Sequence, residues 1–409
     1  MVTDNVVKNR NINVILLENI YPDAVKIYQD EGITVKIVTG SLDEEELCKQ
    51  IKDVSIIGIR SKTQVTERVL KCAEQLLVIG AYCIGTNQID IDACSKRGIV
   101  VFNAPYSNTR SVVELVLGEI IMLIRGVFDR SAKLHQGIWD KSSSGTFEIR
   151  GKKLGIIGYG NIGAQLSVVA EAVGMKVYYY DLVEKLALGN ARKCDSMEEL
   201  LTKVDVVTVH VDGSPENRGL IGAEQFKIMK NGSVFLNLSR GFVVDMDALV
   251  DNIKVGKIRG AAVDVFPDEP KHNNERFRSE LQQLPNVIIT PHIGGSTEEA
   301  QRNIAEFVTS KIIDFVYNGG TALSVNFPNL QLPEIRDSHR LIHLHQNVPG
   351  ILAKVNNILA AHSINIVGQY LKTNENIGYV ITDISREYGS EVITEIKNIP
   401  GTIHFRILY

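Results

Sequence analysis

The sequence has few cysteines, and none of them are arranged as a pair. Its five cysteines are Cys48, Cys72, Cys83, Cys94 and Cys194, and no C-x-x-C motif occurs. An odd number of scattered cysteines is typical of reduced thiols in a cytoplasmic protein, and it argues against a disulfide frame or a zinc site. We therefore expect a cytoplasmic protein without a metal centre.

Long apolar runs and an excess of basic residues are also missing. No apolar stretch approaches the length that spans a bilayer, and the polar segment from Met1 to Arg10 does not read as a signal peptide. The formal net charge is −4, with no basic block, so the chain has no field that would attract nucleic acid. We expect neither a membrane nor a nucleic-acid partner.

What remains is an ordinary globular composition over a long chain. The 409 residues are 44% hydrophobic and 22% charged, values typical of a globular protein. A chain of this length is too long for a single core, so it predicts two or three domains.

The most informative motif is a glycine-rich turn between a strand and a helix. Residues 154–157 form a short apolar run, and Gly158, Gly160 and Gly163 follow with the spacing G-x-G-x-x-G. The first glycine permits a tight turn, the second lets a pyrophosphate approach the backbone, and the third lets the helix pack close to the strand. The N–H groups at the start of that helix then face the phosphates.

An acidic residue completes this motif. A second apolar strand, residues 177–180, ends at Asp181, 18 residues after Gly163. An acid here bonds the ribose hydroxyls and repels the 2′-phosphate of NADP. Leu182 and Val183 follow and offer no cation for that phosphate, so the pattern predicts NAD as the cofactor. A purely structural βαβ unit with a capping Asp is the alternative.

Alternation of strands and helices predicts two doubly wound α/β units. The first unit begins near residue 13 and ends near Pro105, and the second covers residues 151–297 with six expected strands. The helix expected at 296–318 has no sheet of its own to cover, so we expect it to return to the first unit. The predicted domains are therefore a discontinuous one, 1–106 with 298–328, and an inserted dinucleotide-binding domain, 107–297.

The last part of the chain, 338–409, predicts a third and smaller domain. Its pattern is strand, helix, strand, strand, helix, strand, which is the ferredoxin-like βαββαβ arrangement. The segment has no evident catalytic cluster, so we interpret it as a binding or regulatory domain.

Three expected strands of the second unit end in residues that carry chemistry. Arg240 lies in the stretch NLSRG, Glu269 in DVFPDEP and His292 in PHIGGST. Oxidation of an alcohol carbon needs a base for the hydroxyl proton, and a histidine suits this because its ordinary pKa is about 6.5. A glutamate can orient the imidazole, and an arginine offers a planar fork for a carboxylate. Taken alone, His292 could equally be a core histidine.

These motifs together resemble the D-isomer-specific 2-hydroxyacid dehydrogenases from about residue 13 to 328, and the C-terminal unit resembles an ACT domain. The resemblance implies a Rossmann-type NAD domain inserted in a flavodoxin-like substrate domain, with Arg240, Glu269 and His292 as the catalytic set. It also implies cofactor contacts, which map onto Gly158, Gly160, Asn161, Ile162, Gly163, Asp181, Ser239, Arg240, Asp264, His292, Gly294 and Gly295. Asn161 departs from the family, in which His or Arg is frequent at this position.

Substrate and effector residues follow from the same resemblance. Arg60, Ser61 and Asn108 match substrate contacts, Arg240 would hold the carboxylate, and Lys141 lies in a loop that can add positive charge. From the residues alone, Arg60 could equally be a solvated surface arginine. In the ACT unit, His345, Asn347 and Asn365 match the effector motif.

The combination with an ACT domain indicates a particular branch of the family. Such members oxidise D-3-phosphoglycerate to 3-phosphohydroxypyruvate with NAD, the first step of L-serine synthesis, and are homotetramers inhibited by L-serine. Reduction of 2-oxoglutarate is a further expected activity. Two alternatives remain open: a glyoxylate or hydroxypyruvate reductase, and a non-enzymatic NAD-sensing corepressor, against which the ACT unit argues.

Overall fold

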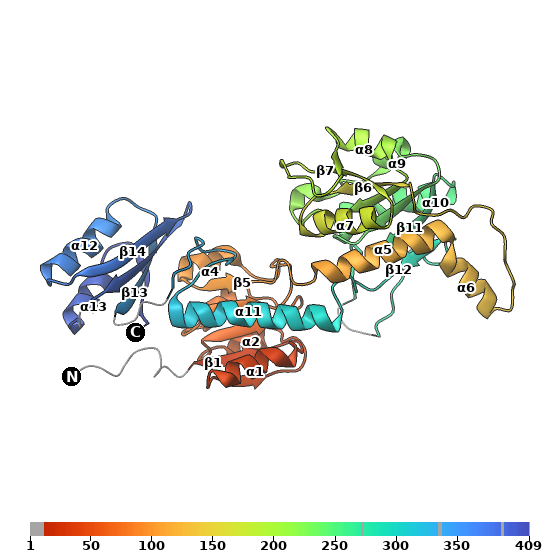
Figure 1. The fold of residues 1–409 in the computed structure, drawn as a ribbon. Coiled ribbons are helices and arrows are strands. Elements are labelled where there is room, and N and C mark those ends of the chain that lie inside the picture. Colours follow the sequence, from red (N-terminus) through yellow and green to blue (C-terminus); the bar gives the residue numbers. More distant parts are fainter. Residues whose placement is uncertain (1–11, 271–273, 334–337, 386–387, 409) are drawn as a thin grey trace. The chain divides into compact units, whose positions relative to one another are not determined.

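The structure is a computed structural model that describes residues 12–270, 274–333, 338–385 and 388–408 (Figure 1). The chain divides into two compact units. One consists of Met1–Pro105 with Arg302–Tyr409, and the other of Tyr106–Gln301. In the described part of the chain, no helix is both long and apolar enough to cross a membrane.

The first unit contains a five-stranded parallel sheet in the order β2-β1-β3-β4-β5. This is the flavodoxin-like order of a doubly wound sheet. Its strands are short and rich in Val and Ile, and β1, β3, β4 and β5 are buried almost throughout, as expected for a sheet covered on both faces. The strands are β1 (Asn13–Leu16), β2 (Thr34–Ile37), β3 (Ile56–Ile59), β4 (Val78–Ala81) and β5 (Val100–Phe102).

Five helices in the described part of this unit accompany the parallel sheet. They are α1 (Pro22–Asp30), α2 (Glu44–Gln50), α3 (Glu67–Cys72), α4 (Ile91–Arg97) and the long α11 (Glu298–Asn318). Asp43, Thr66 and Asp90 cap three of them by accepting a backbone N–H in the first turn. Helix α11 packs directly on the sheet, because a Cβ on Gly80 of β4 would lie 2.8 Å from Ile312 and 3.1 Å from Val308 (Figure 1).

The second unit is built on a parallel sheet in the order β12-β11-β10-β9-β6-β7-β8. Starting at β6, this is the doubly wound order of dinucleotide-binding folds, with one strand more at the β12 edge. The sequence predicts six strands, and the structure adds the two-residue β8, which pairs with β7. The strands are β6 (Lys153–Ile157), β7 (Lys176–Tyr180), β8 (Arg192–Lys193), β9 (Val206–Val209), β10 (Ser233–Asn237), β11 (Ile258–Val263) and β12 (Val287–Ile289).

The helices of the second unit surround that sheet. They are α5 (Thr109–Arg125), α6 (Val127–His135), α7 (Asn161–Ala172), α8 (Met197–Lys203), α9 (Ala223–Ile228) and α10 (Met246–Lys254), with 3₁₀ turns at Pro215–Asn217 and Gly241–Val243. The apolar spacing over residues 109–135 predicts one long helix, and the structure shows that this prediction is wrong. Gly126 adopts φ 58°, which ends α5 in the left-handed region. The chain restarts as α6, whose residues are all at least partly exposed.

The C-terminal part of the first unit is the predicted βαββαβ domain. Its four strands form an antiparallel sheet in the order β14-β15-β13-β16. The elements are β13 (His339–Gln346), α12 (Ile351–Ala361), β14 (Ile366–Thr373), β15 (Ile377–Ile384), α13 (Ser390–Lys397) and β16 (Thr402–Ile407). The fold class predicted from the sequence is therefore confirmed: two doubly wound sheets and one ferredoxin-like sheet.

A buried ion pair anchors this small sheet. The guanidinium of Arg340 makes two hydrogen bonds of 2.7 and 2.8 Å to the carboxylate of Asp383, and both side chains are fully buried. Arg340 also donates to the carbonyls of Asn318 and Pro333, the first of which ends α11. The phenol of Tyr379 donates to the carbonyl of Gly319 next to it. Polar contacts thus tie β13 and β15 to the end of α11.

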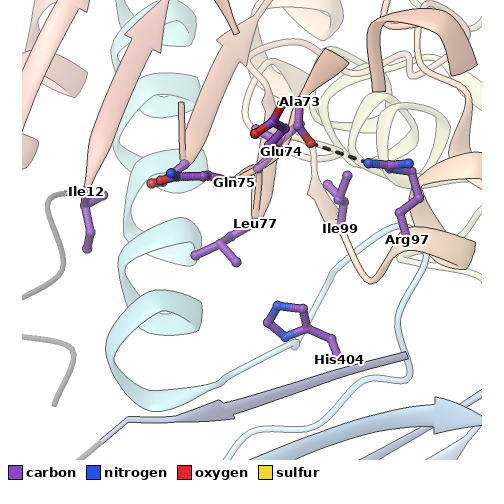
Figure 2. Close-up of a pocket in the computed structure, with 10 residues that line it drawn as sticks. Ile12, Ala73, Glu74, Gln75, Leu77, Arg97, Ile99 and His404 are labelled. Atoms are coloured by element: carbon purple, nitrogen blue, oxygen red, sulfur yellow. Dashed lines mark hydrogen bonds between the residues drawn. The ribbon is translucent and has the colours of Figure 1, made fainter. Parts of the chain in front are cut away.

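The first unit contains a cavity of about 430 Å³, and Figure 2 shows the side chains that line it. Leu77 and Ile99 line it just before β4 and β5 begin, and His404 of β16 closes another side. Arg97 lies at its rim and points to the carbonyl of Ala73, at 3.5 Å. The cavity therefore lies at the amino ends of the strands, whereas ligands of parallel sheets bind beyond the carboxyl ends.

Candidate active site

The glycine turn between β6 and α7 has the geometry that its sequence predicts. Gly158 has φ 91°, and a side chain there would run into the backbone of His210 at 2.7 Å. A Cβ on Gly163 would lie 2.3 Å from the carbonyl oxygen of Gly158, so only glycine lets the helix come this close. A Cβ on Gly160 would meet nothing within 4 Å. The open space at Gly160, facing the start of α7, fits a pyrophosphate.

Asp181 follows β7 and is bound to this turn. Its Oδ2 accepts the N–H of Tyr159 at 2.8 Å, and its Oδ1 accepts the N–H of Val183 at 2.9 Å. The carboxylate is half-buried, whereas the next residue, Leu182, is 86% exposed. Asp181 therefore braces the glycine turn and leaves a negative charge where the ribose hydroxyls of a dinucleotide would lie.

Arg240, Glu269 and His292 follow three neighbouring strands, β10, β11 and β12, at their carboxyl ends. The Nδ1 of His292 lies 2.8 Å from Oε2 of Glu269, and the other oxygen of Glu269 accepts the N–H of Phe266 at 3.1 Å. The structure thus brings the glutamate and the histidine of the predicted set into direct contact. Because Nδ1 faces Glu269, Nε2 is the ring nitrogen available for proton transfer.

This contact shifts both pKa values in the directions of an ion pair. The hydrogen bond to Glu269 raises the pKa of His292, against an opposing effect of burial. For Glu269, burial favours the neutral form, but the hydrogen bond and charge of His292, the N–H of Phe266 and the charge of Arg240 together lower its pKa. The pair is partly exposed, with side-chain exposures of 49% for His292 and 34% for Glu269, so a substrate can reach the imidazole.

Arg240 lies close enough to this pair to affect it electrostatically. Its charge acts on the pKa of both His292 and Glu269. Its Nη1 donates to the carbonyl of Ser239 at 2.7 Å, and its own carbonyl accepts from the side chain of Asn237 at 3.0 Å. The remaining donors of the guanidinium form a fork that can bind a carboxylate in two places.

Asp264 holds the loop that carries His292. Its carboxylate accepts the hydroxyl of Thr290 at 2.6 Å and the N–H groups of Ile293 and Gly294, each at 2.8 Å. The N–H of His292 donates to the backbone carbonyl of Asp264 at 2.8 Å. These bonds keep His292 in a left-handed backbone conformation with φ 54°, which a non-glycine residue rarely adopts. Asp264, which the family resemblance assigns to cofactor binding, therefore also holds the backbone of His292 in place.

Glu119 of α5 is a buried acid that does not belong to the predicted set of site residues. It is fully buried, and neither of its carboxylate oxygens has a hydrogen-bond partner among the described residues. Burial and the negative charge of Asp264 raise the pKa of Glu119 to about 8. Its signal in the sequence is an acid within the apolar stripe of a helix.

The predicted substrate residues occupy different elements. Arg60 is half-buried and Ser61 exposed, in the turn after β3 of the first unit. In the second unit, Asn108 precedes α5, and its side chain lies where a Cβ on Gly295 would be, at 2.4 Å. Lys141 is exposed in the loop after α6. Within its own unit, the structure thus joins Asn108 to the turn of Gly294 and Gly295.

The structure does not bring the predicted effector residues together within one chain: His345 and Asn347 lie at the end of β13, and Asn365 lies at the opposite end of the sheet, before the start of β14. His345 is only 3% exposed, its Nδ1 lies 2.8 Å from the carbonyl of Gln346, and its ring covers Gly378. Asn347 is exposed and donates to the carbonyl of Asn374 at 2.8 Å. Asn365 is exposed just before β14. The side chains of the two asparagines are thus accessible in this chain, whereas the imidazole of His345 is buried.

Comparison with known proteins decides the family. Residues 117–294 match the model described as D-isomer specific 2-hydroxyacid dehydrogenase, NAD binding domain, and residues 341–404 match an AHAS small subunit-like ACT domain. The chain is 49% identical over 399 residues to D-3-phosphoglycerate dehydrogenase of Haemophilus influenzae, covering 97% of both chains. It belongs to the D-isomer-specific 2-hydroxyacid dehydrogenase family. The enzyme is thus an NAD-dependent oxidoreductase, as the sequence motifs predict.

Further similarities agree with this assignment. The Escherichia coli K12 D-3-phosphoglycerate dehydrogenase is 48% identical, with 97% of this chain and 98% of that protein covered. The structure of D-2-hydroxyisocaproate dehydrogenase matches with a TM-score of 0.70 and 26% identity, over 77% of this chain and all of that one. A D-lactate dehydrogenase from Aquifex aeolicus, solved with NAD and lactic acid, matches with a TM-score of 0.64 and 29% identity, over 74% and 95% of the two chains.

Proposed function

We propose that this enzyme oxidises the 2-hydroxy group of D-3-phosphoglycerate to give 3-phosphohydroxypyruvate, the first step of L-serine biosynthesis in the cytoplasm. The observation that carries the proposal is the His292–Glu269 hydrogen bond beside Arg240, in a chain that matches relatives named D-3-phosphoglycerate dehydrogenase along 97% of its length. The odd number of cysteines, with no C-x-x-C motif, agrees with a reducing compartment.

Bound NAD would supply the hydride acceptor, and Gly158, Gly160, Gly163 and Asp181 would hold it. The chain itself has to move a proton and hold a carboxylate. Nε2 of His292 takes the proton of the substrate hydroxyl, and Glu269 stabilises the imidazolium that results. The guanidinium of Arg240 binds the carboxylate next to the reacting carbon, which fixes the carbon relative to His292.

The phosphate needs cations away from this pair. Arg60 and Ser61 in the turn after β3 offer a guanidinium and a hydroxyl, and Lys141 offers an ammonium group from an exposed loop. Asn108, in contact with the turn of Gly295, provides a neutral donor. We propose Arg60 as the main phosphate contact, with Lys141 as a further source of positive charge. Ser61 and Asn108 are proposed as contacts of the substrate.

A second activity is reduction of other 2-oxo acids. The Arg–Glu–His arrangement recognises a carboxylate next to a carbonyl and does not itself read a phosphate. Reduction of 2-oxoglutarate, which we propose as the further activity, therefore uses the same groups in the reverse direction. A glyoxylate or hydroxypyruvate reductase is the alternative main function, because it would use the same groups too. An NAD-sensing corepressor without activity is set aside, because the chain belongs to a family of enzymes.

The ACT domain supports regulation by L-serine in a homotetramer. Asn347 and Asn365 are exposed near the edge strand β14, where a second ACT sheet could pair with the unbonded strand edge. Asn347 lies beside the end of β14 and Asn365 before its start, so a serine would bind between Asn347 of one subunit and Asn365 of another, where it would bias the enzyme between two conformations. His345, buried against Gly378, would act in this site only after its ring moves.

The test is an assay of NADH production from D-3-phosphoglycerate and NAD, with and without L-serine. Turnover of the phosphorylated substrate well above that of D-glycerate is the expected result. If neither substrate is oxidised but glyoxylate is reduced, the assignment of the substrate is wrong. Loss of serine inhibition in Asn347→Ala with Asn365→Ala, at unchanged uninhibited kcat, locates the effector. Equal inhibition of the double variant would place it elsewhere.

A further inference from the structure

Two buried polar side chains fasten the turn that carries Arg60. The first is Glu18, which follows β1 and is 7% exposed. Its Oε2 accepts the N–H of Lys62 at 3.0 Å, and its Oε1 accepts the N–H of Thr63 at 2.8 Å. Since β1 and β3 are neighbours in the sheet, the carboxylate crosses from the end of one strand to the turn after the next.

The backbone at Glu18 is held in an unusual conformation to achieve this. Glu18 and Asn19 have φ values of 60° and 52°, in the left-handed region that non-glycine residues rarely adopt. The N–H of Glu18 donates to the carbonyl of Gly40 at 2.8 Å, which fixes the turn from the other side. Such strained residues persist where surrounding contacts determine them, and they concentrate at functional sites.

The second side chain is Gln88, in the segment that follows β4. It is 7% exposed, and its Nε2 donates to the carbonyl of Arg60 at 2.6 Å and to that of Gly85 at 3.2 Å. The turn is therefore hydrogen-bonded at both ends. The side-chain amide of Gln88 donates to the carbonyl of Arg60, and the carboxylate of Glu18 accepts the N–H groups of Lys62 and Thr63. Glu18 and Gln88 lie in the segments that follow β1 and β4, the two strands that flank β3 in the sheet.

We propose that Glu18 and Gln88 are positioning residues, which hold the turn from Arg60 to Thr63 in the conformation that binds the phosphate of a phosphorylated 2-hydroxy acid. This inference rests on the proposed function, in which Arg60 contacts that phosphate. Neither side chain touches the substrate. They act by fixing the backbone from which the guanidinium of Arg60 extends.

The charge of Glu18 makes this arrangement informative. A free carboxylate close to a phosphate site would repel the ligand, but here two backbone N–H groups bind the carboxylate, and hydrogen bonds of this kind are strong. The same bonds consume the N–H groups of Lys62 and Thr63, so these amides are not donors for the phosphate. Recognition of the phosphate by this turn is then left to its other groups, foremost the side chain of Arg60.

The test compares Glu18→Ala, Glu18→Gln and Gln88→Ala in the full-length enzyme. For each variant, kcat and KM are measured with D-3-phosphoglycerate and with D-glycerate as the unphosphorylated 2-hydroxy acid. Glu18→Ala is expected to raise KM for D-3-phosphoglycerate by about 10- to 100-fold, the equivalent of one charge-assisted hydrogen bond. Glu18→Gln keeps one acceptor and is expected to fall between wild type and Glu18→Ala. For D-glycerate, KM is expected to stay within about threefold.

A control separates positioning from mere stability. Asp245→Ala removes a carboxylate that caps α10 by accepting the N–H of Ala248, far along the chain from the turn, and it should lower Tm while leaving KM unchanged. If the Glu18 variants behave in the same way, with lower Tm and unchanged KM for both substrates, Glu18 is only structural and the inference fails.

The variant Arg60→Ala distinguishes this failure from a failure of the proposed function. If Arg60→Ala leaves KM for D-3-phosphoglycerate unchanged, the phosphate lies elsewhere and the substrate assignment of Arg60 is wrong. If Arg60→Ala raises KM but Glu18→Ala and Gln88→Ala do not, only the positioning role is rejected. In the double variant Glu18→Ala with Arg60→Ala, KM should rise no further than in Arg60→Ala alone, because Glu18 acts through Arg60.

Discussion

The Nδ1 of His292 lies 2.8 Å from Oε2 of Glu269, although 23 positions separate the two residues in the chain. They meet because β11 and β12 are neighbouring parallel strands whose carboxyl ends share an edge. The hydrogen bond raises the pKa of the imidazole and lowers that of the carboxyl group. The arrangement of β11 and β12 thus sets the pKa values of the two side chains that we propose for proton transfer.

The two pKa shifts make the stability of the fold depend on pH. A raised pKa means that the protonated His292 stabilises the fold at low pH and that this contribution is lost as the pH rises through its folded-state value. A lowered pKa means that ionised Glu269 contributes above its ordinary pKa and ceases to as the pH falls through its folded-state value. The pair is fully charged between these two values.

Oxidation of a hydroxy acid requires neutral His292, so the acid limb of kcat/KM should lie above the ordinary histidine pKa of about 6.5. In Glu269→Gln, the anionic partner is lost, and the limb should move to lower pH while activity is retained. The position of the acid limb is measured from initial rates of NADH formation over a range of about pH 5.5 to about pH 9.5. A limb at the same pH in wild type and variant would contradict the pairing.

Removal of the imidazole tests its role as base directly. His292→Ala is expected to lower kcat by about 10²–10⁴-fold, with NAD binding largely kept. His292→Asn is a matched variant, because asparagine tolerates the left-handed conformation at φ 54° but cannot act as the base. Equal losses in both variants assign the effect to the lost base. Near-normal kcat in His292→Asn would exclude His292 as the base.

Asp181 determines the choice of cofactor in this interpretation. Asp181→Ala removes the charge that repels a 2′-phosphate, so the preference for NAD over NADP should narrow by about tenfold or more. The variant also loses the acceptors for Tyr159 and Val183, so NAD itself should bind more weakly. The values of kcat/KM for both cofactors measure the effect. Efficient use of NADP by the wild type would refute the argument.

Glu119 predicts a second, structural pH dependence. Its pKa of about 8 in the fold exceeds its value in the unfolded chain, so its neutral form is stabilising at low pH and this contribution is lost as the pH rises towards 8. Glu119→Gln removes the loss and should stabilise the second unit by a few kcal/mol at about pH 8 but little at about pH 5. Thermal unfolding of both proteins at the two pH values is the measurement. A pH-independent difference in Tm would argue against a neutral Glu119.

The buried pair of Arg340 and Asp383 should matter more for stability than any exposed pair. Asp383→Ala leaves a buried guanidinium without its anion and is expected to destabilise the first unit by about 3–5 kcal/mol. Arg302→Ala breaks the exposed 3.3 Å pair with Asp23 and should destabilise the unit far less, because water and salt screen an exposed pair. Denaturant unfolding of the two variants gives the comparison, and similar losses in both would contradict it.

Local patterns were sufficient to predict much of this molecule. The glycine spacing and Asp181 predict the turn after β6, because a tight turn and close helix packing leave few alternatives to glycine. Strand ends carrying Arg240, Glu269 and His292 predict a shared edge for the same topological reason. The broken helix at Gly126 was missed, since a glycine inside an apolar pattern is compatible with a continuous helix.

Other features depend on contacts between distant segments, which periodicity does not reveal. Glu18 is 44 positions from Lys62, and nothing in its local sequence indicates a hydrogen bond there. The burial of His345 arises from its register opposite Gly378 in β15, which only sheet pairing determines. Glu119 was visible in the apolar stripe of α5, but its proximity to Asp264 required the packing of that helix on the sheet.

The core of the first unit joins its two sheets through α11. Val78 of β4, Ile312 of α11 and Ile381 of β15 belong to one continuous apolar cluster. Neither sheet can then open by itself without exposing the shared cluster to water, so the two should behave as a single cooperative segment. In native-state hydrogen exchange, the slowest amides of β3 and β15 are therefore expected to have similar free energies of opening, even though more than 300 residues separate the two strands.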